Sequence, residues 1–420
     1  MTKKKLHLGA FVFSAGQHVA AWRHESSAAE HLLDTHLYEQ LAVIAESGKL
    51  DMLLILEMLA VPEKSPGVFD DAKTYPTPDT MTLATILANV TSKIGIGVTH
   101  TTSYNDPYRV AHKFSTLSHL TKGRIGWNMV TTQDNKVAFN FSRDGHFEHT
   151  DRYNRAGEFV KAVDELWQNI DESKQLQFKG NYFNIEGQLP VPPLTYGRPI
   201  RVQAGSSASG MNFGAQYADA IFTAQTNIED AKKFYRDVKT LATTYGRSYD
   251  EIKIMPGLSP YIADTEEEAK QLERELNELT SIEAGLTYLK ILVDVDLSQF
   301  DLDAPAPVHL MDPEKNNDKK ARVEIVRNKA IAENFTLRQL AQWTSLGGGH
   351  YPFIGTPQQL ADFMEHWLEE EACDGFVIMP PIYPGSLSDF VDKVVPILQD
   401  KGIFRTEYSG VTLEHHLQEV

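Results

Sequence analysis

The chain contains 420 residues, of which 42% are hydrophobic, and its formal net charge is -17 at pH 7. A chain of this length can bury a large core and would form one big or two medium domains. Acidic and basic residues are mixed along it, so it offers no basic stripe for nucleic acid or for an anionic membrane. Its single cysteine, Cys373, excludes an internal disulfide framework and is typical of a cytoplasmic protein.

The first apolar run covers residues 6–13. It is short, contains His7 and passes directly into the polar segment 16–25, so it predicts a strand rather than a signal peptide. No later run reaches the roughly 20 apolar residues that a membrane span requires. We therefore expect no membrane contact.

Further short apolar runs follow along the chain, and amphipathic helical patterns separate most of them. A stripe of Leu37, Leu41 and Ile44 on one helical face is an example. A hairpin is expected at 178–187. The runs that predict buried strands are 6–13, 51–58, 94–100, 124–132, 199–206, 218–224, 251–260 and 374–381.

Eight buried strands with helices between most of them predict a parallel sheet of the α/β class, closed as a (β/α)8 TIM barrel. A doubly wound open sheet is the main alternative, but it would not need an eighth strand so near the C-terminus. We expect a single domain over 1–420. The residues between the seventh and eighth strands, 261–373, are too many for one crossover and predict an insertion with a helical segment, a lid loop and a cap.

In a barrel of this kind, the loops after the carboxyl ends of the strands carry the chemistry. Taken singly, each polar residue there could merely satisfy a loop backbone. Asn128 is the least expected, because it and Trp127 interrupt an otherwise apolar strand. The polar residues at these ends are Gln17, His18, Trp22, Arg23, Glu57, Thr102, Ser103, Asn128, Ser206 and Ser207.

Two features indicate an anion site. The segment "GSSASG" (205–210) follows a strand and opens a helix, where backbone N–H groups and hydroxyls can hold an anion. His149 and Tyr153 are four residues apart near the start of another helix, so both can point the same way. Together with Ser206 and Ser207 they would satisfy a phosphate. The alternative is that these residues only cap and pack their helices.

Other chemistries find less support in the sequence. The histidine pairs at 146–149 and 414–416 lack metal-ligand spacing and a cysteine partner, so we expect no metal site. A G-x-G-x-x-G dinucleotide motif, a G-x-S-x-G elbow and a P-loop are all absent from the sequence. Acyl transfer and phosphoryl transfer are therefore not indicated.

At the level of whole motifs, the chain resembles the bacterial-luciferase-like flavin monooxygenases. The most similar branch contains nitrilotriacetate monooxygenase component A, dibenzothiophene-sulfone monooxygenase and long-chain alkane monooxygenase. The motifs are "GQHVAAWRHE" (16–25), "GRIGWNMVTT" (123–132), "HTDRYNRAGEF" (149–159), "QAGSS" (203–207), "FIGTPQQLADFM" (353–364), "DGFVIM" (374–379) and "FVDKVVPILQDKGIFRTEYSGVTL" (390–413). They span essentially the whole chain.

The resemblance implies a two-component monooxygenase. A separate NAD(P)H:flavin reductase would supply reduced FMN, and oxygen would add to the flavin as a hydroperoxide that oxygenates a small organosulfur, amine, chelator or alkane substrate. Asn128 would contact the polar edge of the flavin ring, and Trp127 would wall that side. Thr102 or Ser103 would lie near the ring. Glu57 stands where this branch usually has Asp, so its carboxylate is one methylene longer.

Further roles follow from the same resemblance. His149, Tyr153, Ser206 and Ser207 would hold the FMN phosphate. His18, on the first loop, and His350, beside three glycines in a hinge-like stretch, are candidates for catalysis on the substrate side. The family also favours a homodimer or homotetramer.

Two competing functions remain. One is a deazaflavin-dependent dehydrogenase on the same barrel, and the other is a catalytically silent flavin-binding protein.

Overall fold

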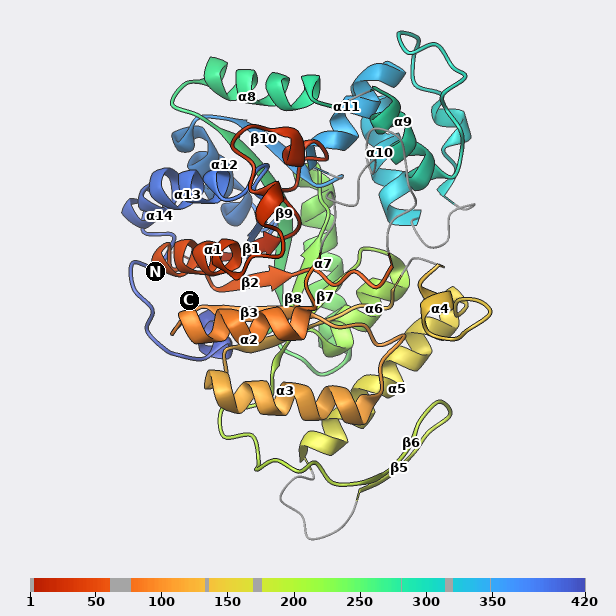
Figure 1. Cartoon of the computed structure of the whole chain (residues 1–420), viewed down its shortest axis with the longest axis vertical. Helices are drawn as coiled ribbons and strands as arrows, with labels where there is room; N and C mark the ends of the chain where they lie inside the picture. Colours follow the sequence, from red (N-terminus) through yellow and green to blue (C-terminus); the bar gives the residue numbers. More distant parts are fainter. Residues whose placement is uncertain are drawn as a thin grey trace.

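The computed structural model describes residues 4–60, 77–132, 136–168, 176–280, 282–313, 320–347 and 349–419. Eight parallel strands of this part close into a barrel (Figure 1). They are β1 (His7–Val12), β2 (Met52–Ile55), β3 (Gly95–Thr99), β4 (Ile125–Met129), β7 (Ile200–Ala204), β8 (Ala220–Thr223), β9 (Lys253–Ile262) and β11 (Gly375–Ile378). Parallel pairing of β8 with β9 and of β11 with β1 closes the ring, which confirms the predicted barrel and excludes an open sheet.

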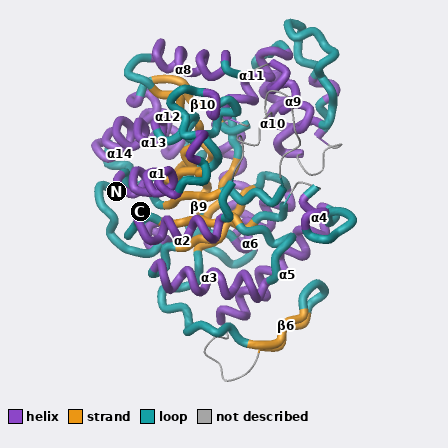
Figure 2. Tube along the Cα trace, viewed as in Figure 1, coloured by secondary structure: helices purple, strands orange, loops and turns teal. Residues whose placement is uncertain are grey.

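Helices cover the outside of the barrel, and Figure 2 shows them surrounding the strands. Side chains cap several of them: Asp34 accepts from a backbone N–H at the start of α1, and Asp106 does so before α3, which opens on Pro107. The covering helices are α1 (Thr35–Ser47), α2 (Thr80–Val90), α3 (Pro107–Thr121), α5 (His149–Gln168), α6 (Ala208–Tyr217), α7 (Ile228–Thr244), α12 (Pro357–Glu369), α13 (Gly385–Asp389) and α14 (Val395–Asp400), whereas the short helix α4 (Val137–Asn140) lies in the segment between β4 and α5. The expected hairpin is confirmed as β5 (Leu176–Lys179) and β6 (Asn184–Gly187), which pair antiparallel.

The barrel interior is filled by side chains that alternate along each strand with outward ones. Phe11, Leu54, Val202 and Phe222 belong to this inner cluster. At the amino-terminal end, Leu413 of α15 (Leu413–Gln418) closes the bottom of the barrel. A Cβ on Gly95 would lie 2.5 Å from Leu413, so this strand needs glycine there.

Trp127 lies in the outer layer. Its ring packs between Phe114 of α3 and Phe159 of α5, with centroids 5.7 and 5.9 Å away, and its Nε1 donates to the carbonyl of His100 at 2.8 Å. The expectation that Trp127 walls the flavin side is therefore wrong. Strand alternation is the reason, because Asn128 points inward and its neighbour must point outward.

The predicted insertion is confirmed between β9 and β11. It contains α8 (Glu266–Glu278), α9 (Ile282–Val293), α10 (Lys320–Ala332), α11 (Leu337–Gly347) and β10 (Tyr351–Gly355), followed by α12. β10 extends the sheet beside β9, with Tyr351 opposite Leu258. Part of the predicted lid loop, 314–319, lies outside the described residues.

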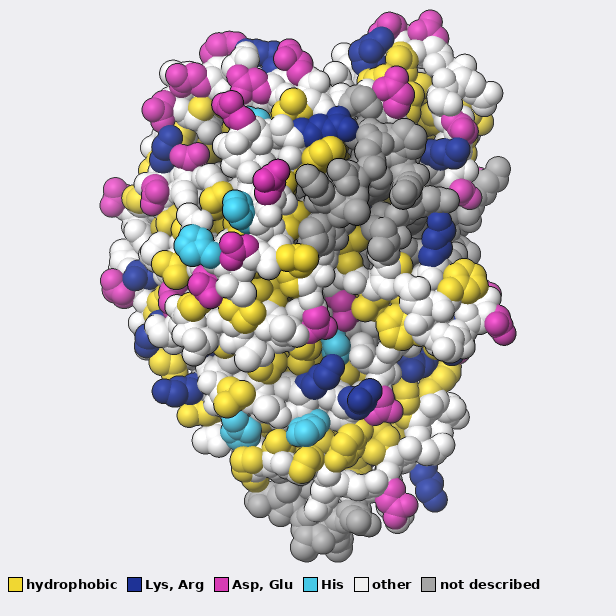
Figure 3. Space-filling model, in the orientation of Figure 1, with side chains coloured by type: hydrophobic (Ala, Val, Ile, Leu, Met, Phe, Trp, Pro, Cys, Tyr) yellow, Lys and Arg dark blue, Asp and Glu magenta, His cyan; other side chains and the backbone are white. Residues whose placement is uncertain are grey.

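Helices α9, α10 and α11 form a second hydrophobic core of their own, which includes Leu289, Val326 and Leu340. Figure 1 shows these helices grouped at one corner of the molecule, beside the barrel. The space-filling view in Figure 3 shows acidic and basic side chains interspersed over one face, as the sequence indicates. In the described part of the chain, no helix combines the length and the apolar character needed to cross a membrane.

Candidate active site at the carboxyl ends of the strands

Asn128 is the most informative polar residue of the barrel. It is buried, and its Nδ2 donates to Oγ1 of Thr99 on the paired strand at 2.9 Å. Its carbonyl oxygen Oδ1 is buried and has no hydrogen-bond partner within the described part of the chain. Because buried polar atoms are normally paired, this oxygen indicates that a donor from a ligand belongs there.

Glu57 organises the loop after β3. One carboxylate oxygen lies 3.0 Å from Nδ1 of His100, and the other accepts the backbone N–H of Thr101 at 2.9 Å. Both oxygens therefore serve donors of the chain itself. A direct contact between Glu57 and a flavin stays a prediction.

Thr102 and Ser103 are buried in this same loop. Both the backbone N–H and the hydroxyl of Thr102 donate to the carbonyl of Val130, at 2.9 and 3.1 Å. The N–H of Ser103 donates to the hydroxyl of Thr101 at 3.1 Å. These bonds fix the loop against the end of β4, beside Asn128.

Two arginines of α5 donate hydrogen bonds to the loops at the carboxyl ends of the barrel strands. Neither was predicted from the sequence to be a site residue. Arg152 donates to the carbonyl of Thr132 at 2.6 Å, and Arg155 donates to the carbonyl of Thr102. The Arg155 guanidinium also lies over the Phe183 ring, 4.6 Å from its centroid. Their spacing of three residues near the start of a helix was the available signal, since it places both on one face.

The predicted phosphate residues are only partly brought together. A Cβ on Gly210 would lie 3.2 Å from the hydroxyl of Tyr153 and 3.2 Å from that of Ser207, so these two hydroxyls converge on a small-residue turn. Ser207 also caps α6 by accepting the N–H of Gly210 at 3.2 Å. The side chain of His149, at the start of α5, lies outside the described part of the structure.

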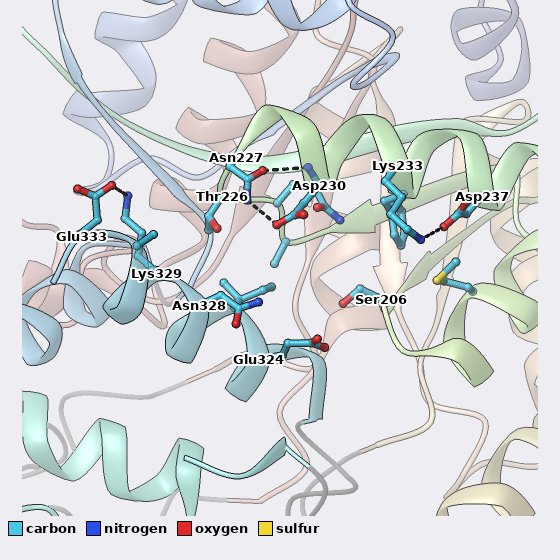
Figure 4. Close-up of a pocket in the computed structure, with 16 residues that line it drawn as sticks. Ser206, Thr226, Asn227, Asp230, Lys233, Asp237, Glu324, Asn328, Lys329 and Glu333 are labelled. Atoms are coloured by element: carbon cyan, nitrogen blue, oxygen red, sulfur yellow. Dashed lines mark hydrogen bonds and ion pairs between the residues drawn. The ribbon is translucent and has the colours of Figure 1, made fainter. Parts of the chain in front are cut away.

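Ser206 lies on the other side of this turn. It lines a cavity of about 550 Å³ between the start of α7 and the insertion helix α10, together with Asn227, Lys233 and Glu324 (Figure 4). Lys233 pairs with Asp237 there, and Lys329 of α10 pairs with Glu333 at 3.1 Å. The cavity opens beside the predicted phosphate end of the site.

His18 connects the first loop to the insertion. Its ring meets that of Tyr261 edge-on at 6.3 Å, and its Nδ1 accepts the N–H of Ala20 at 3.1 Å. Burial lowers the pKa of His18 to about 3, although the nearby side-chain amide of Asn277 of α8 opposes the shift. His18 is therefore neutral at physiological pH and carries its proton on Nε2.

Arg23, on the same loop, donates to the carbonyl of Leu279 at 2.9 Å, directly after α8. Its guanidinium also lies over the Trp22 ring, 4.6 Å from the centroid. The first loop and the first insertion helix are thus joined by polar contacts.

His350 lies over the barrel interior. Its ring stacks on Phe222, with centroids 4.9 Å apart and planes 8° from parallel. A Cβ on Gly257 would overlap Nδ1 of His350. Burial, and secondly the charge of Arg322, hold the pKa of His350 well below its usual range, so this residue is neutral too.

Comparisons with known proteins identify the family of the chain. Residues 11–373 match the family model described as luciferase-like monooxygenase. N-acetyl-S-(2-succino)cysteine monooxygenase of Bacillus subtilis is 42% identical, covering 99% of this chain and 96% of the relative. Nitrilotriacetate monooxygenase component A of Aminobacter aminovorans is also 42% identical, with the same coverage.

A solved structure with the same fold is riboflavin lyase in complex with modified FMN and riboflavin. It superposes with a TM-score of 0.84 at 28% identity and covers 99% of this chain and 96% of that chain. The resemblance that the sequence motifs indicated is thereby confirmed.

Proposed function

Because the chain belongs to the luciferase-like monooxygenase family, we propose that it uses reduced FMN and oxygen to oxygenate a small organic molecule. The observation that carries the cofactor assignment is the buried, unpartnered Oδ1 of Asn128 at the carboxyl end of β4. As in a relative named as component A, a separate NAD(P)H:flavin reductase would supply the reduced flavin.

The polar residues of the site suit FMN at both of its ends, the ring system and the phosphate. Asn128 offers an acceptor oxygen where the polar edge of the ring system would lie, and Tyr153 and Ser207 offer hydroxyls for a phosphate. We assign Glu57, Thr102 and Ser103 to holding the loop that borders the ring. His149 and Ser206 complete the proposed phosphate end.

When bound, reduced FMN would supply the activation of oxygen. The chain would bind and orient the flavin and the substrate and exclude water from the site. Asn128 would orient the ring through its amide carbonyl. The neutral imidazoles of His18 and His350 offer hydrogen bonds near the substrate without adding charge, because burial lowers the pKa of each. The insertion would limit the access of water to the barrel mouth.

The two competing functions differ in what they do with oxygen and electrons. A silent flavin-binding protein would bind FMN but turn over nothing, and a deazaflavin-dependent dehydrogenase would oxidise its substrate by passing a hydride to oxidised deazaflavin, without consuming oxygen. Relatives in this family act on chemically different substrates, so the fold gives no choice among organosulfur, amine or chelator, and alkane compounds.

The deciding experiment supplies the protein with FMN, a flavin reductase, NADH and oxygen. A panel of thioethers, sulfones and amines is then screened for oxygenated products by mass spectrometry with ¹⁸O₂. Incorporation of one ¹⁸O atom per product supports the proposal. Binding of FMN without any product across the panel favours the silent protein, and substrate oxidation with oxidised deazaflavin in the absence of oxygen favours the dehydrogenase.

A further inference from the structure

The β5–β6 hairpin lies outside the barrel, next to α5, and one carboxylate of that helix holds its turn (Figure 1). Glu158 accepts, at 2.8, 2.7 and 2.8 Å, the backbone N–H groups of three consecutive turn residues, Asn181, Tyr182 and Phe183. A Cβ on Gly180 would overlap this carboxylate, so a larger residue there would displace it. Because hydrogen bonds to an ionised acceptor are the strong ones, these three bonds fix the turn against α5.

The fixed turn places the ring of Phe183 against Arg155. The guanidinium of Arg155 lies 4.6 Å from the centroid of this ring and 5.0 Å from that of Phe147, within the range of cation–π attraction. Phe183 also meets Phe159 of the hydrophobic core edge-on, with centroids 5.4 Å apart. Two aromatic rings, one of them anchored in the core, thus restrict where the guanidinium can lie.

The guanidinium of Arg155 donates a hydrogen bond to the carbonyl of Thr102. The N–H of the same peptide unit belongs to Ser103, and it donates to the hydroxyl of Thr101 at 3.1 Å. A peptide unit is planar, so bonds to its carbonyl and to its N–H together determine its rotation. Thr102 and Ser103 are buried in the loop that we assign to the border of the flavin ring. Arg155 therefore fixes one side of a peptide at the proposed ring site.

Arg155 keeps its charge in this half-buried position. Burial, and secondly the charge of Arg143, lower the pKa of Arg155, whereas the carboxylates of Asp151, Asp106 and Glu158 raise it. A guanidinium stays protonated after such a shift, because its ordinary pKa is far above physiological pH. The hydrogen bond to the carbonyl of the loop is thus made by a charged donor, which is stronger than a neutral one.

We infer that Arg155 is a positioning residue for the flavin: held by the hairpin turn, it orients the Thr102–Ser103 peptide that borders the ring. This inference rests on the proposed function, because the loop that Arg155 orients is the one assigned to the flavin. The contacts run from the hairpin turn, through the Phe183 ring and the Arg155 guanidinium, to the Thr102 carbonyl. An element outside the barrel therefore acts on the site without touching the cofactor.

Two properties of flavin binding distinguish a positioning residue from one that only stabilises the fold. A defect on the ring side should weaken FMN and riboflavin by the same factor, because both carry the ring and only FMN carries the phosphate. Arg155→Lys should also restore part of the loss, since lysine keeps the charge and a donor but lacks the planar fork of arginine.

The main variant is Arg155→Met, which keeps an unbranched side chain and removes the charge and the donors. Fluorescence titration should show both FMN and riboflavin weakened by about tenfold, the effect of losing a hydrogen bond from a charged donor. Hydrogen–deuterium exchange of the flavin-free protein should also be faster in residues 100–105 than in wild type. This second readout depends on neither turnover nor bound flavin.

Phe183→Leu tests the link to the hairpin, because it removes the ring and keeps an apolar side chain. It should weaken both flavins, as Arg155→Met does. Since Phe183 acts through Arg155, the double variant should bind flavin no more weakly than Arg155→Met alone. Lys161→Met is the matched control, because Lys161 is an exposed cation of the same helix, and it should leave flavin binding unchanged. Thermal unfolding shows whether each variant keeps its fold.

Four results in folded variants would overturn the inference. They are normal flavin binding by Arg155→Met, a loss for FMN that riboflavin does not share, additive losses in the double variant, and an equal loss in Lys161→Met. If Arg155→Met does not fold, normal flavin binding by Phe183→Leu overturns it instead. A wild-type protein that binds no flavin would contradict the proposed function, whereas unchanged exchange of residues 100–105 in Arg155→Met contradicts this inference alone.

Discussion

The amide of Asn128 donates to the hydroxyl of Thr99 across 2.9 Å, and this bond joins two neighbouring barrel strands at their carboxyl ends. It fixes the rotation of the amide, so that Oδ1 is the atom left for a ligand. A residue that served only the fold would satisfy both of its polar ends within the chain. The pairing therefore separates the orienting function of Thr99 from the ligand-facing function of Asn128.

Asn128→Leu should uncouple flavin oxidation from product formation. The substitution roughly keeps the volume and removes the carbonyl that we expect to orient the ring, so NADH consumption should continue while hydrogen peroxide replaces product. Thr99→Val is the control, since it removes the same hydrogen bond but keeps the carbonyl. Peroxide and product are measured per NADH consumed. Normal coupling in Asn128→Leu would show that Asn128 is structural.

Removing the phosphate hydroxyls should weaken FMN more than riboflavin. Tyr153→Phe combined with Ser206→Ala should cost roughly 1–3 kcal/mol of FMN binding, the usual value for hydrogen bonds to a charged group. Tyr217→Phe is the matched control, because Tyr217 packs on the same Phe213 ring as Tyr153. Fluorescence titration with both flavins measures the effect. If wild type binds riboflavin as tightly as FMN, the phosphate assignment is wrong.

Periodicity and motif order were sufficient to predict the barrel. Each expected strand appears in the structure, although the bounds differ by a few residues; the seventh, for example, was expected at 251–260 and is Lys253–Ile262. Local apolar patterns determine such elements because each strand must bury both of its faces. Trp127 shows the limit of this reasoning. The register of the strand decides which of two adjacent residues faces the barrel interior, and the residue types alone do not reveal that register.

The insertion could be located from the sequence but not resolved in detail. Its second core depends on contacts among three helices, and α10 shows little amphipathic pattern from which to predict a buried face. Arg322 looks like any surface arginine in the sequence. Only the folded chain places it beside His350, 28 residues away.

Stability should fall as the pH drops below about 6.5. Burial lowers the pKa of His18 to about 3, so between these values the unfolded chain binds a proton that the folded chain does not. This one group should cost about 1.4 kcal/mol per pH unit, or about 2 kcal/mol between pH 6.5 and pH 5. The stability it contributes is complete above pH 6.5.

Urea unfolding of wild type and His18→Gln at pH 7 and pH 5 measures the contribution of His18 to the pH dependence of stability. The difference in unfolding free energy between the two pH values should be smaller in the variant by about 2 kcal/mol. His31→Gln, at an exposed position, is the matched control. An unchanged pH dependence in His18→Gln would contradict a buried neutral imidazole.

The insertion should respond to ligands under limited proteolysis. The sequence "DPEKNNDKK" (312–320) has little apolar content, so we expect cleavage there in the free protein and protection with flavin and substrate bound. Helices α9–α11 should resist cleavage because they share a buried core. Mass spectrometry locates the cuts. Cleavage that ligands do not change would contradict a lid, and protection that follows protein concentration would indicate a subunit interface.

Gly257→Ala should displace His350 while leaving the barrel closed. The added Cβ would overlap Nδ1 of His350 and lie 2.7 Å from Sδ of Met379, and overpacking of this kind costs about 1–3 kcal/mol. Gly385→Ala is the control, since a Cβ at that position has no heavy atom within 4 Å. Because we propose that His350 lies on the substrate side, Gly257→Ala should also lower product formation, whereas FMN binding should persist. Chemical denaturation, FMN titration and product analysis of both variants measure these effects. A destabilised Gly257→Ala protein that forms product normally would show that the position of His350 does not matter for turnover.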